Sequence, residues 1–176
     1  MFINRRAHAM EALETALAIN QSDATAKNIL GVLYGETGRF PLAVEQFQSA
    51  LRDEPGNANT LFNLGFVQQK QDAHLVAIKS FDAALRINPS IDRAWFGRGI
   101  SYAALGQHQQ AISDFERAAK LQPMNPHALV ELGMQYYAIG NQEKVIDVIN
   151  RLREFDPKAT QELIYATNTT FEIKKS

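Results

Sequence analysis

Histidine side chains are the first candidates for chemistry in this sequence. The four histidines are His8, His74, His108 and His127, and His74 and His108 lie 34 residues apart. Imidazole nitrogens bind Zn²⁺, but a zinc site needs about four ligands, and the chain contains no cysteine to supply the others. We therefore interpret the histidines as surface residues and predict no metal site.

Other short motifs also fail to predict catalysis. The segment Gly97–Gly99 resembles part of a phosphate-binding loop, but we expect it inside a helix with no strand before it. The segment Asn168–Thr170 has the spacing of an N-glycosylation site, which we interpret as chance because no secretory signal is recognisable. No carboxylate pair and no nucleophile beside a base stands out. The sequence predicts a protein that is not an enzyme and needs no cofactor.

The overall composition narrows the class of partner. The chain has 176 residues, with 18 basic and 19 acidic side chains and a formal net charge of −1. A nucleic-acid ligand is not expected, because phosphate binding requires a concentrated basic surface. Insertion into a membrane is not expected either, because no apolar run is long enough to span one. A cytoplasmic location is the default expectation, although removal of a signal or of an upstream region would leave the same sequence.

Two residue types recur with a fixed step of 34 residues. The set comprises Gly31, Gly65, Gly99 and Gly133, and Pro55, Pro89, Pro123 and Pro157. This period is typical of a helix–turn–helix unit copied head to tail, and it predicts an all-α solenoid of stacked helix pairs. Full repeats are predicted at 24–57, 58–91, 92–125 and 126–159. Their helices are predicted at about 24–37 and 40–53, 58–71 and 74–87, 92–105 and 108–121, and 126–139 and 142–155.

Residue size along each second helix explains part of the period. Ala111, Phe115 and Ala118 lie at i, i+4 and i+7, on one face of a helix. The small residues let a neighbouring helix approach, and the phenyl ring fills the space between. In the first helices, a mid-helix glycine such as Gly99 costs about 1 kcal/mol relative to alanine. Because this glycine recurs in all four units, it indicates a close crossing of two helices. The left-handed ends of first helices are expected at Gly38, Gly106 and Gly140. Asp72, which tolerates that conformation less well, replaces the glycine in the second unit. The repeated prolines are expected to end second helices.

The third unit resembles the tetratricopeptide repeat. The matching residues are Trp95, Gly99, Tyr102, Leu105, Gly106, Ala111, Phe115, Ala118 and Pro123. The resemblance extends over 24–159 in four copies, with partial copies at both ends. It implies a right-handed superhelix of antiparallel helix pairs that acts as a scaffold or adaptor in protein–protein interactions. Lys27, Gln68 and Arg98 stand where the family usually has tryptophan, tyrosine and leucine.

The two ends of the chain depart from the full repeat. Residues 5–21 match only the second half of a unit, through Ala9, Leu13 and Ala16. Such a helix would lack its partner helix, so we expect a fragment of a longer array, a degenerate cap, or a helix supplied by another copy. A final helix near 160–172 combines an apolar stripe that includes Phe171 with a polar opposite face, as a solubilising cap would.

The resemblance implies that a peptide ligand lies along the inner face of the first helices. At about 100° per residue, this face is opposite Trp95 and Tyr102 in the third unit. The predicted groove residues are Asn28, Val32, Asn59, Phe62, Asn63, Phe66, Arg93, Phe96, Ile100, His127, Val130 and Met134.

The apolar groove residues have two expected positions. Those expected to pack between adjacent first helices are Phe62, Phe96 and Val130, and those expected to be exposed in the groove are Phe66, Ile100 and Met134. An exposed apolar strip of that size would mark a binding site. The asparagines could hydrogen-bond a peptide backbone and Arg93 could bind an acidic group, although each also fits a solvated surface residue.

One subfamily of these repeats binds the acidic C-terminal tails of chaperones through a clamp of lysines, asparagines and an arginine. Asn63 and Arg93 match that clamp, whereas Asn28, Val32 and Gly97 stand where a lysine, an asparagine and an arginine are needed. Our leading hypothesis is therefore an interaction module that binds a partner peptide in the groove. The alternatives are self-assembly through the N-terminal half repeat and, with less support, a cochaperone adaptor that binds an acidic tail.

Overall fold

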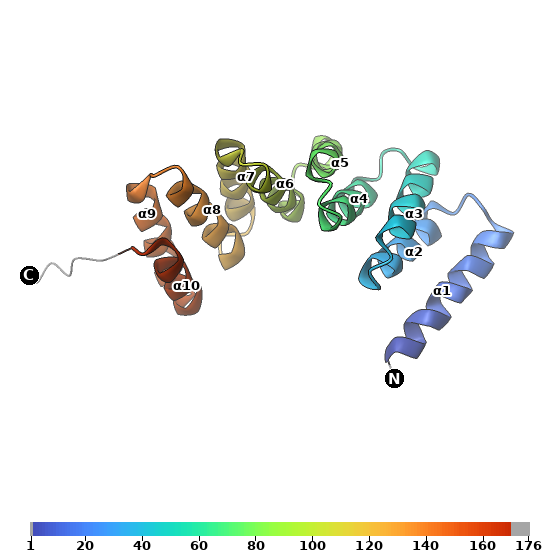
Figure 1. Ribbon diagram of the computed structural model, residues 1–176. Helices are drawn as coiled ribbons and strands as arrows, with labels where there is room; N and C mark the ends of the chain where they lie inside the picture. The colour runs from blue at the N-terminus through green and yellow to red at the C-terminus, as the bar shows by residue number, and fades with distance from the viewer. Residues whose placement is uncertain (1, 170–176) are drawn as a thin grey trace, which may run out of the picture. The chain divides into compact units, whose positions relative to one another are not determined.

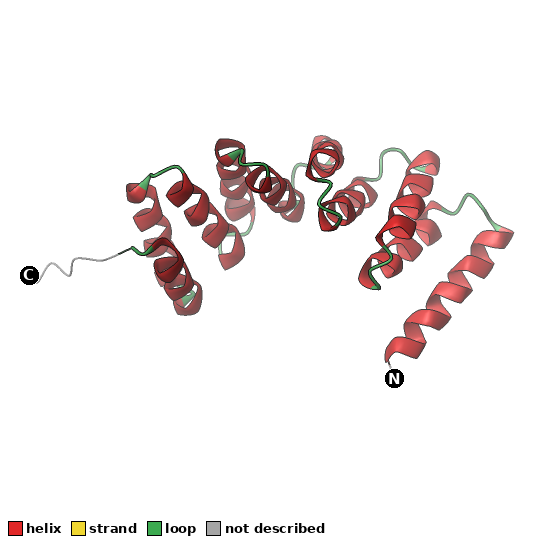
Figure 2. Ribbon diagram, viewed as in Figure 1, coloured by secondary structure: helices red, strands yellow, loops and turns green. Residues whose placement is uncertain are grey.

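A computed structural model describes residues 2–169, in which every regular element is an α-helix (Figures 1 and 2). In chain order the helices are α1 (Phe2–Ile19), α2 (Ala24–Glu36), α3 (Phe40–Asp53), α4 (Ala58–Lys70), α5 (His74–Ile87), α6 (Asp92–Ala104), α7 (His108–Leu121), α8 (Pro126–Ala138), α9 (Gln142–Arg153) and α10 (Pro157–Thr167). They form two compact units, one ending at Gly97 and the other beginning at Arg98, so the boundary lies inside α6.

The bounds of α2 to α9 agree with the predicted helices to within two residues. Side-chain caps fix several of the starts, since Asp23 accepts a hydrogen bond from the backbone N–H of Ala26 at 2.8 Å, and Asn57 accepts one from Thr60 at 3.0 Å. The turns between first and second helices are left-handed at the three expected glycines and also at Asp72. Their φ angles are 74° at Gly38, 58° at Asp72, 69° at Gly106 and 73° at Gly140.

The last helix begins earlier than predicted. Pro55, Pro89 and Pro123 lie in the turns after α3, α5 and α7, whereas Pro157 is the first residue of α10. Asp156 caps this helix by accepting a hydrogen bond from the N–H of Ala159 at 2.9 Å. A proline fits the first helical position because the N–H that it lacks has no partner there. The helix therefore starts three residues before the predicted position and ends at Thr167, and Phe171 lies outside the described residues.

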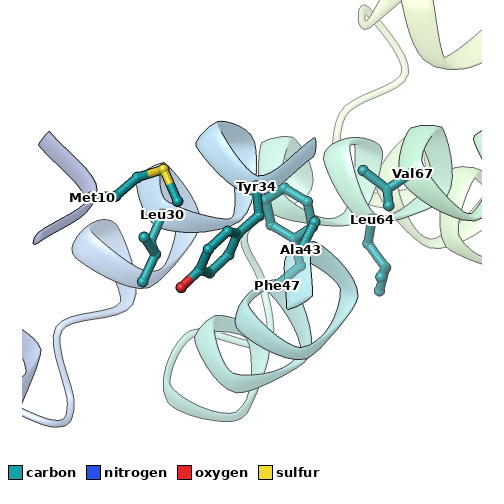
Figure 3. Close-up of a cluster of buried hydrophobic side chains, with 7 residues drawn as sticks. All are labelled: Met10, Leu30, Tyr34, Ala43, Phe47, Leu64 and Val67. Carbon is teal, nitrogen blue, oxygen red and sulfur yellow. The ribbon is translucent and has the colours of Figure 1, made fainter. Parts of the chain in front are cut away.

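In the first unit, each helix packs against the next from α1 to α5. Figure 3 shows a core cluster that draws residues from four of these helices. Its members are Met10, Leu30, Tyr34, Ala43, Phe47, Leu64 and Val67. A second cluster is built around Phe81, which is fully buried. The first cluster holds α2 and α4 side by side, since both helices contribute residues to it.

The repeated glycines mark the close crossings that the period predicted. A Cβ atom placed on Gly31 would lie 2.7 Å from the ring of Phe47, and one on Gly65 would lie 2.9 Å from the ring of Phe81. At Gly133 the nearest atoms belong to Leu163 of α10, at 2.5 Å. The last glycine thus makes room for the final helix.

In the second unit, α7 packs on α8, α8 packs on α9, and α10 covers both α8 and α9. The large apolar side chains that are fully buried in this unit include Phe115, Leu129, Leu132, Val145, Ile149, Leu152 and Leu163. Across the described residues, none of the helices has the length and apolar character that a membrane crossing requires.

The three departures from the family pattern form polar pairs between the two helices of a repeat. These pairs are Lys27–Asp53, Gln68–Ser80 and Arg98–Asp114. The hydroxyl of Ser80 donates to Gln68 at 2.7 Å, and Arg98 donates to both carboxylate oxygens of Asp114 at 2.8 and 2.6 Å. A buried polar group needs such a partner to offset the loss of water.

Candidate functional site

In the first unit, α4 carries a row of polar and aromatic residues along one face. Asn59, Asn63, Phe66 and Lys70 follow one another at steps of three or four residues, and Phe62 lies three residues after Asn59 and four before Phe66, so all five follow one side of the helix. The Phe62 ring is half-buried, with centroid separations of 6.0 Å from Phe81 and 6.4 Å from Phe66. Phe66 keeps 45% of its surface exposed. The core therefore holds Phe62, and Phe66 extends the aromatic surface into solvent.

Two cations lie over these rings. The Nζ atom of Lys70 is 5.3 Å from the centroid of Phe66, and Cζ of Arg93, from the first turn of α6, is 5.1 Å from the centroid of Phe62. Both distances allow a cation–π interaction. Neither Lys70 nor Arg93 forms a salt bridge with an acidic residue of the described chain, so their charge is available to a ligand.

Amide side chains join the neighbouring first helices. Asn63 of α4 donates from Nδ2 to Oδ1 of Asn28 in α2 at 3.2 Å, and Gln69 donates to the carbonyl oxygen of Gly97 at 2.7 Å. The Asn63–Asn28 bond leaves Nδ2 of Asn28 and Oδ1 of Asn63 able to bind a peptide group. Asn59 is exposed at the start of α4. The face thus combines amides, aromatic rings and cations.

Three further residues of the first unit, the predicted groove residues Val32 and Phe96 and the clamp position Gly97, have other surroundings. Val32 is half-buried and packs against the first core cluster, so it supports the groove from below. At Gly97 a Cβ atom would lie 2.7 Å from Cζ of Phe81, so a side chain there would displace the ring. Phe96 is half-buried.

The second unit contains the remaining predicted groove residues. Ile100, Val130 and Met134 are half-buried, and His127 is exposed. Glu131 shares this part of α8, and burial raises the pKa of its carboxyl group, partly opposed by His127 one turn earlier. Because these residues belong to a separate unit, a strip continuous with Phe66 remains a prediction.

Sequence reasoning missed how the groove side chains pair. Lys70 has a visible signal, since it follows Phe66 by four residues and so faces the same way. The amide bond between Asn28 and Asn63 has none, because it depends on how closely α2 and α4 approach. Stacking of Arg93 on Phe62 depends in the same way on the approach of α6 to α4.

His74 and His108 each contact a side chain of their own unit. The Nε2 atom of His74 lies 3.9 Å from Asp72, and its Nδ1 atom is buried without a hydrogen bond. The Nδ1 atom of His108 lies 2.9 Å from Oε1 of Gln135. In the part of the chain that the structure describes, no three His, Asp or Glu side chains gather where they could hold a metal ion.

A depression of 390 Å³ lies between α7, α8 and α9 in the second unit. Tyr136 and Glu116 help to line it, and the tyrosine hydroxyl donates to Oε1 of Glu116 at 2.6 Å. Burial, together with this hydrogen bond, raises the pKa of Tyr136 to about 12. The depression also holds side chains of both charges, Lys144, Asp147 and Arg151.

Comparison with known families identifies the repeat. One tetratricopeptide repeat model matches residues 3–58 and 30–90, and a second matches residues 92–125. A search of curated proteins finds no match.

Solved structures share the fold. A crystal structure of MamA is 20% identical and superimposes with a TM-score of 0.80 over 89% of each chain. YrrB, described as a TPR protein with an unusual peptide-binding site, is 24% identical, with a TM-score of 0.81 over 95% of this chain and 86% of its own. The first TPR of Spaghetti (RPAP3), bound to the HSP90 peptide SRMEEVD, is 25% identical, with a TM-score of 0.66 over 66% of this chain and 93% of its own.

Proposed function

Because the chain belongs to the tetratricopeptide repeat family, we propose that it is a non-catalytic interaction module that binds a peptide segment of a partner protein. The proposed groove in the first unit comprises Asn28, Asn59, Phe62, Asn63, Phe66, Lys70 and Arg93. The exposed ring of Phe66 carries the proposal, because it lies beside the Lys70 cation and on the same helix face as two asparagines. Two structures that share the fold support it, since YrrB is described with a peptide-binding site and the first TPR of Spaghetti is described as bound to a peptide.

Phe66 would supply most of the binding free energy. A phenylalanine with 45% of its surface exposed leaves an apolar area that a peptide side chain can cover. Aromatic anchors of this kind dominate many interfaces, particularly where polar groups surround them. Phe62 holds Phe66 from one side through the ring contact at 6.4 Å. The anchor is therefore partly ordered before a ligand arrives, which lowers the entropy cost of binding.

The asparagines would bind the peptide backbone. The hydrogen bond between Asn28 and Asn63 orients both amides and leaves the Nδ2 amino group of Asn28 as a donor and Oδ1 of Asn63 as an acceptor for the ligand. A donor and an acceptor together match one peptide group of an extended segment. Such contacts recognise a backbone regardless of sequence, so side-chain preference would come from Phe66 and the cations Lys70 and Arg93.

An acidic C-terminal tail is the alternative ligand for this groove. Asn63 and Arg93 occupy clamp positions, but Asn63 is bonded to Asn28 and Arg93 is stacked on Phe62. The position of the clamp arginine holds Gly97, where the ring of Phe81 leaves no room for a side chain. We therefore expect the peptide SRMEEVD to bind more weakly than peptides selected for the groove.

A displayed library of random peptides tests the groove directly. The immobilised chain is expected to enrich a shared motif that contains an apolar residue. Phe66→Lys should lose the selected peptides, since it removes the anchor and adds a third cation. Leu75→Lys is the matched control, because Leu75 is also an exposed apolar residue of the first unit but lies on α5.

The outcome separates the groove from the rest of the surface. If the wild type and Phe66→Lys bind the peptides equally, and circular dichroism shows that both are folded, the binding site does not include Phe66. Ile100→Lys and Met134→Lys then ask whether the second unit contributes. Loss of the same peptides in these variants would support a groove that continues along the chain, and unchanged binding would confine it to the first unit.

A further inference from the structure

The charged side chains of the groove proposed in the first unit are all positive. Lys70 and Arg93 are exposed, and neither forms an ion pair with another residue of the described chain. The helix α4 contains no acidic residue, and the one acidic residue of α2, Glu36, is paired with Arg6 at 3.2 Å. Asp92, in the first turn of α6, forms no ion pair with either cation of the groove in the described chain. The two charges are therefore available to a ligand of opposite sign.

These two cations are not part of the repeated pattern of the chain. The positions at whole periods of 34 residues from Lys70 hold Glu36, Ala104 and Ala138, and those from Arg93 hold Thr25, Asn59 and His127. Packing of the repeat therefore does not require a positive charge at either position. Their occurrence together in the first unit is a property of this groove.

The exposed ring of Phe66 lies between the two cations along α4. Phe62 and Lys70 are each four residues from Phe66, one on either side, and Arg93 lies over the Phe62 ring at 5.1 Å. Leu64 belongs to the first core cluster (Figure 3), and Phe66 lies about 160° around the helix from it. The groove thus presents a positive, an apolar and a positive site in that order, on the side of α4 away from the cluster.

The spacing of the three sites matches an extended peptide. A step of four residues advances about 6 Å along a helix. Alternate residues of an extended chain point to the same side and lie about 6.6 Å apart. An extended segment that follows α4 can therefore place three alternate side chains at the three sites.

We propose that the groove selects an extended segment in which an acidic residue lies two positions before, and another two positions after, an apolar residue. The proposal rests on the peptide-binding function given above and adds the class of partner. The apolar side chain covers Phe66, and the two carboxylates lie beside Lys70 and Arg93. Both carboxylates are side chains inside the segment, so binding requires no free C-terminus, in contrast to the clamp for chaperone tails.

Charge favours this segment over a basic or a neutral one. A basic segment would bring like charges together at both ends of the groove, and a neutral one would cover Phe66 without using either cation. Because both cations are exposed, each ion pair is expected to change the affinity by no more than about fivefold. The charges therefore act mainly by selecting among partners and by speeding their association.

The displayed library of random peptides also tests this motif. The wild-type chain should enrich aspartate or glutamate two positions before and after the apolar residue. Lys70→Glu should change the preference at one of these positions to lysine or arginine, and Arg93→Glu should do so at the other. Lys79→Glu is the matched control, because Lys79 is an exposed lysine of the same unit on α5, and it should keep the wild-type preference.

A selected peptide with both termini blocked measures the contribution of charge by fluorescence anisotropy. Replacing either acidic residue of the peptide by glutamine should weaken binding by up to about fivefold. Raising the NaCl concentration from about 50 mM to about 500 mM should remove most of this difference. Blocking the C-terminus should leave the affinity unchanged.

The results distinguish failure of the motif from failure of the groove. If the library enriches an apolar motif that Phe66→Lys loses, but shows no acidic preference or keeps it in Lys70→Glu and Arg93→Glu, the peptide-binding function stands and the motif is wrong. If binding needs a free C-terminus, the motif is also wrong. If no motif is enriched, or if Phe66→Lys retains it, the peptide-binding function fails and the motif fails with it.

Discussion

The ring of Phe81 provides a strict test of how closely the helices of the first unit pack. The residue is fully buried, and its ring centroid lies 6.0 Å from that of Phe62. A Cβ atom on Gly97 would lie 2.7 Å from Cζ of this ring, 3.0 Å from Cε1 and 3.2 Å from Cε2. A Cβ atom on Gly65 would approach the same ring to 2.9 Å from α4. An alanine at Gly97 must therefore displace a ring that is held on both sides.

Two opposing terms determine the size of the effect. Replacing a mid-helix glycine by alanine stabilises a helix by about 1 kcal/mol. Overpacking a buried site costs about 1–3 kcal/mol. Because Gly65 of α4 also lies close against the Phe81 ring, the ring has little space to move away from Gly97, and we expect overpacking to dominate. Gly97→Ala should then lower the free energy of unfolding by up to about 2 kcal/mol.

A double-mutant cycle with Phe81→Leu isolates the contact. Leucine lacks the Cε and Cζ atoms that a Cβ on Gly97 would meet, so the clash disappears in that background. Gly97→Ala should then stabilise the protein by about 1 kcal/mol, which gives a coupling of about 1–3 kcal/mol. Urea unfolding followed by circular dichroism measures the four variants. Gly56→Ala is the control, since no atom lies within 4 Å of its Cβ position.

Additive effects of the two substitutions would show that the Phe81 ring does not limit the space at Gly97. Additivity would mean that Gly97→Ala has the same effect whether or not the aromatic ring is present. Helical arrays can unfold in more than one step. The amide hydrogen exchange of α5 should therefore be measured as well, because it reports the stability of the segment that carries Phe81.

Three further predictions concern the second unit. Asp114→Ala should destabilise the protein by about 1.5–3 kcal/mol in urea unfolding, because it removes the buried carboxylate that accepts two charge-assisted hydrogen bonds from Arg98. Tyr136→Phe should lower the free energy of unfolding by about 1 kcal/mol, and in an ultraviolet titration it should remove the tyrosine that titrates near pH 12. Because the pKa of Tyr136 is raised in the folded state, the wild type should lose stability between about pH 10 and 12. Glu131→Gln should raise the melting temperature at pH 7, since burial disfavours the charged carboxylate, and the gain should vanish as the pH falls to the point where Glu131 is protonated in both states.

The helices of this protein were predictable because one physical requirement recurs with a fixed period. A glycine must face a large side chain in each crossing, as Gly31 faces Phe47 and Gly65 faces Phe81. Local signals then fixed the ends, including the left-handed turn at Asp72 that requires no glycine. The last helix was misplaced because Pro157 was assigned the role of the earlier prolines, although Asp156 makes it the first residue of a helix.

The groove was only partly predictable for a different reason. Helical periodicity indicates that Phe62 and Phe66 share a face, but it cannot show that the buried ring of Phe81 leaves Phe66 as the exposed one. The bond between Asn28 and Asn63 joins two repeats and depends on their separation. Such contacts between helices depend on tertiary packing, which cannot be predicted from the spacing of residues within one helix.

The polar pairs at three family positions make the repeats of this chain different from one another. If α2 packed against α5 in place of α3, Lys27 would be buried without Asp53, and the cost of an unpaired buried charge would oppose the exchange. The same holds for Gln68, whose partner Ser80 exists only in α5. Because the pairs differ in chemistry and in position along the helices, each of the three first helices that carry them is expected to have its lowest free energy against its own second helix. A repeated glycine and phenylalanine pattern would allow several stacking orders, and these pairs select one.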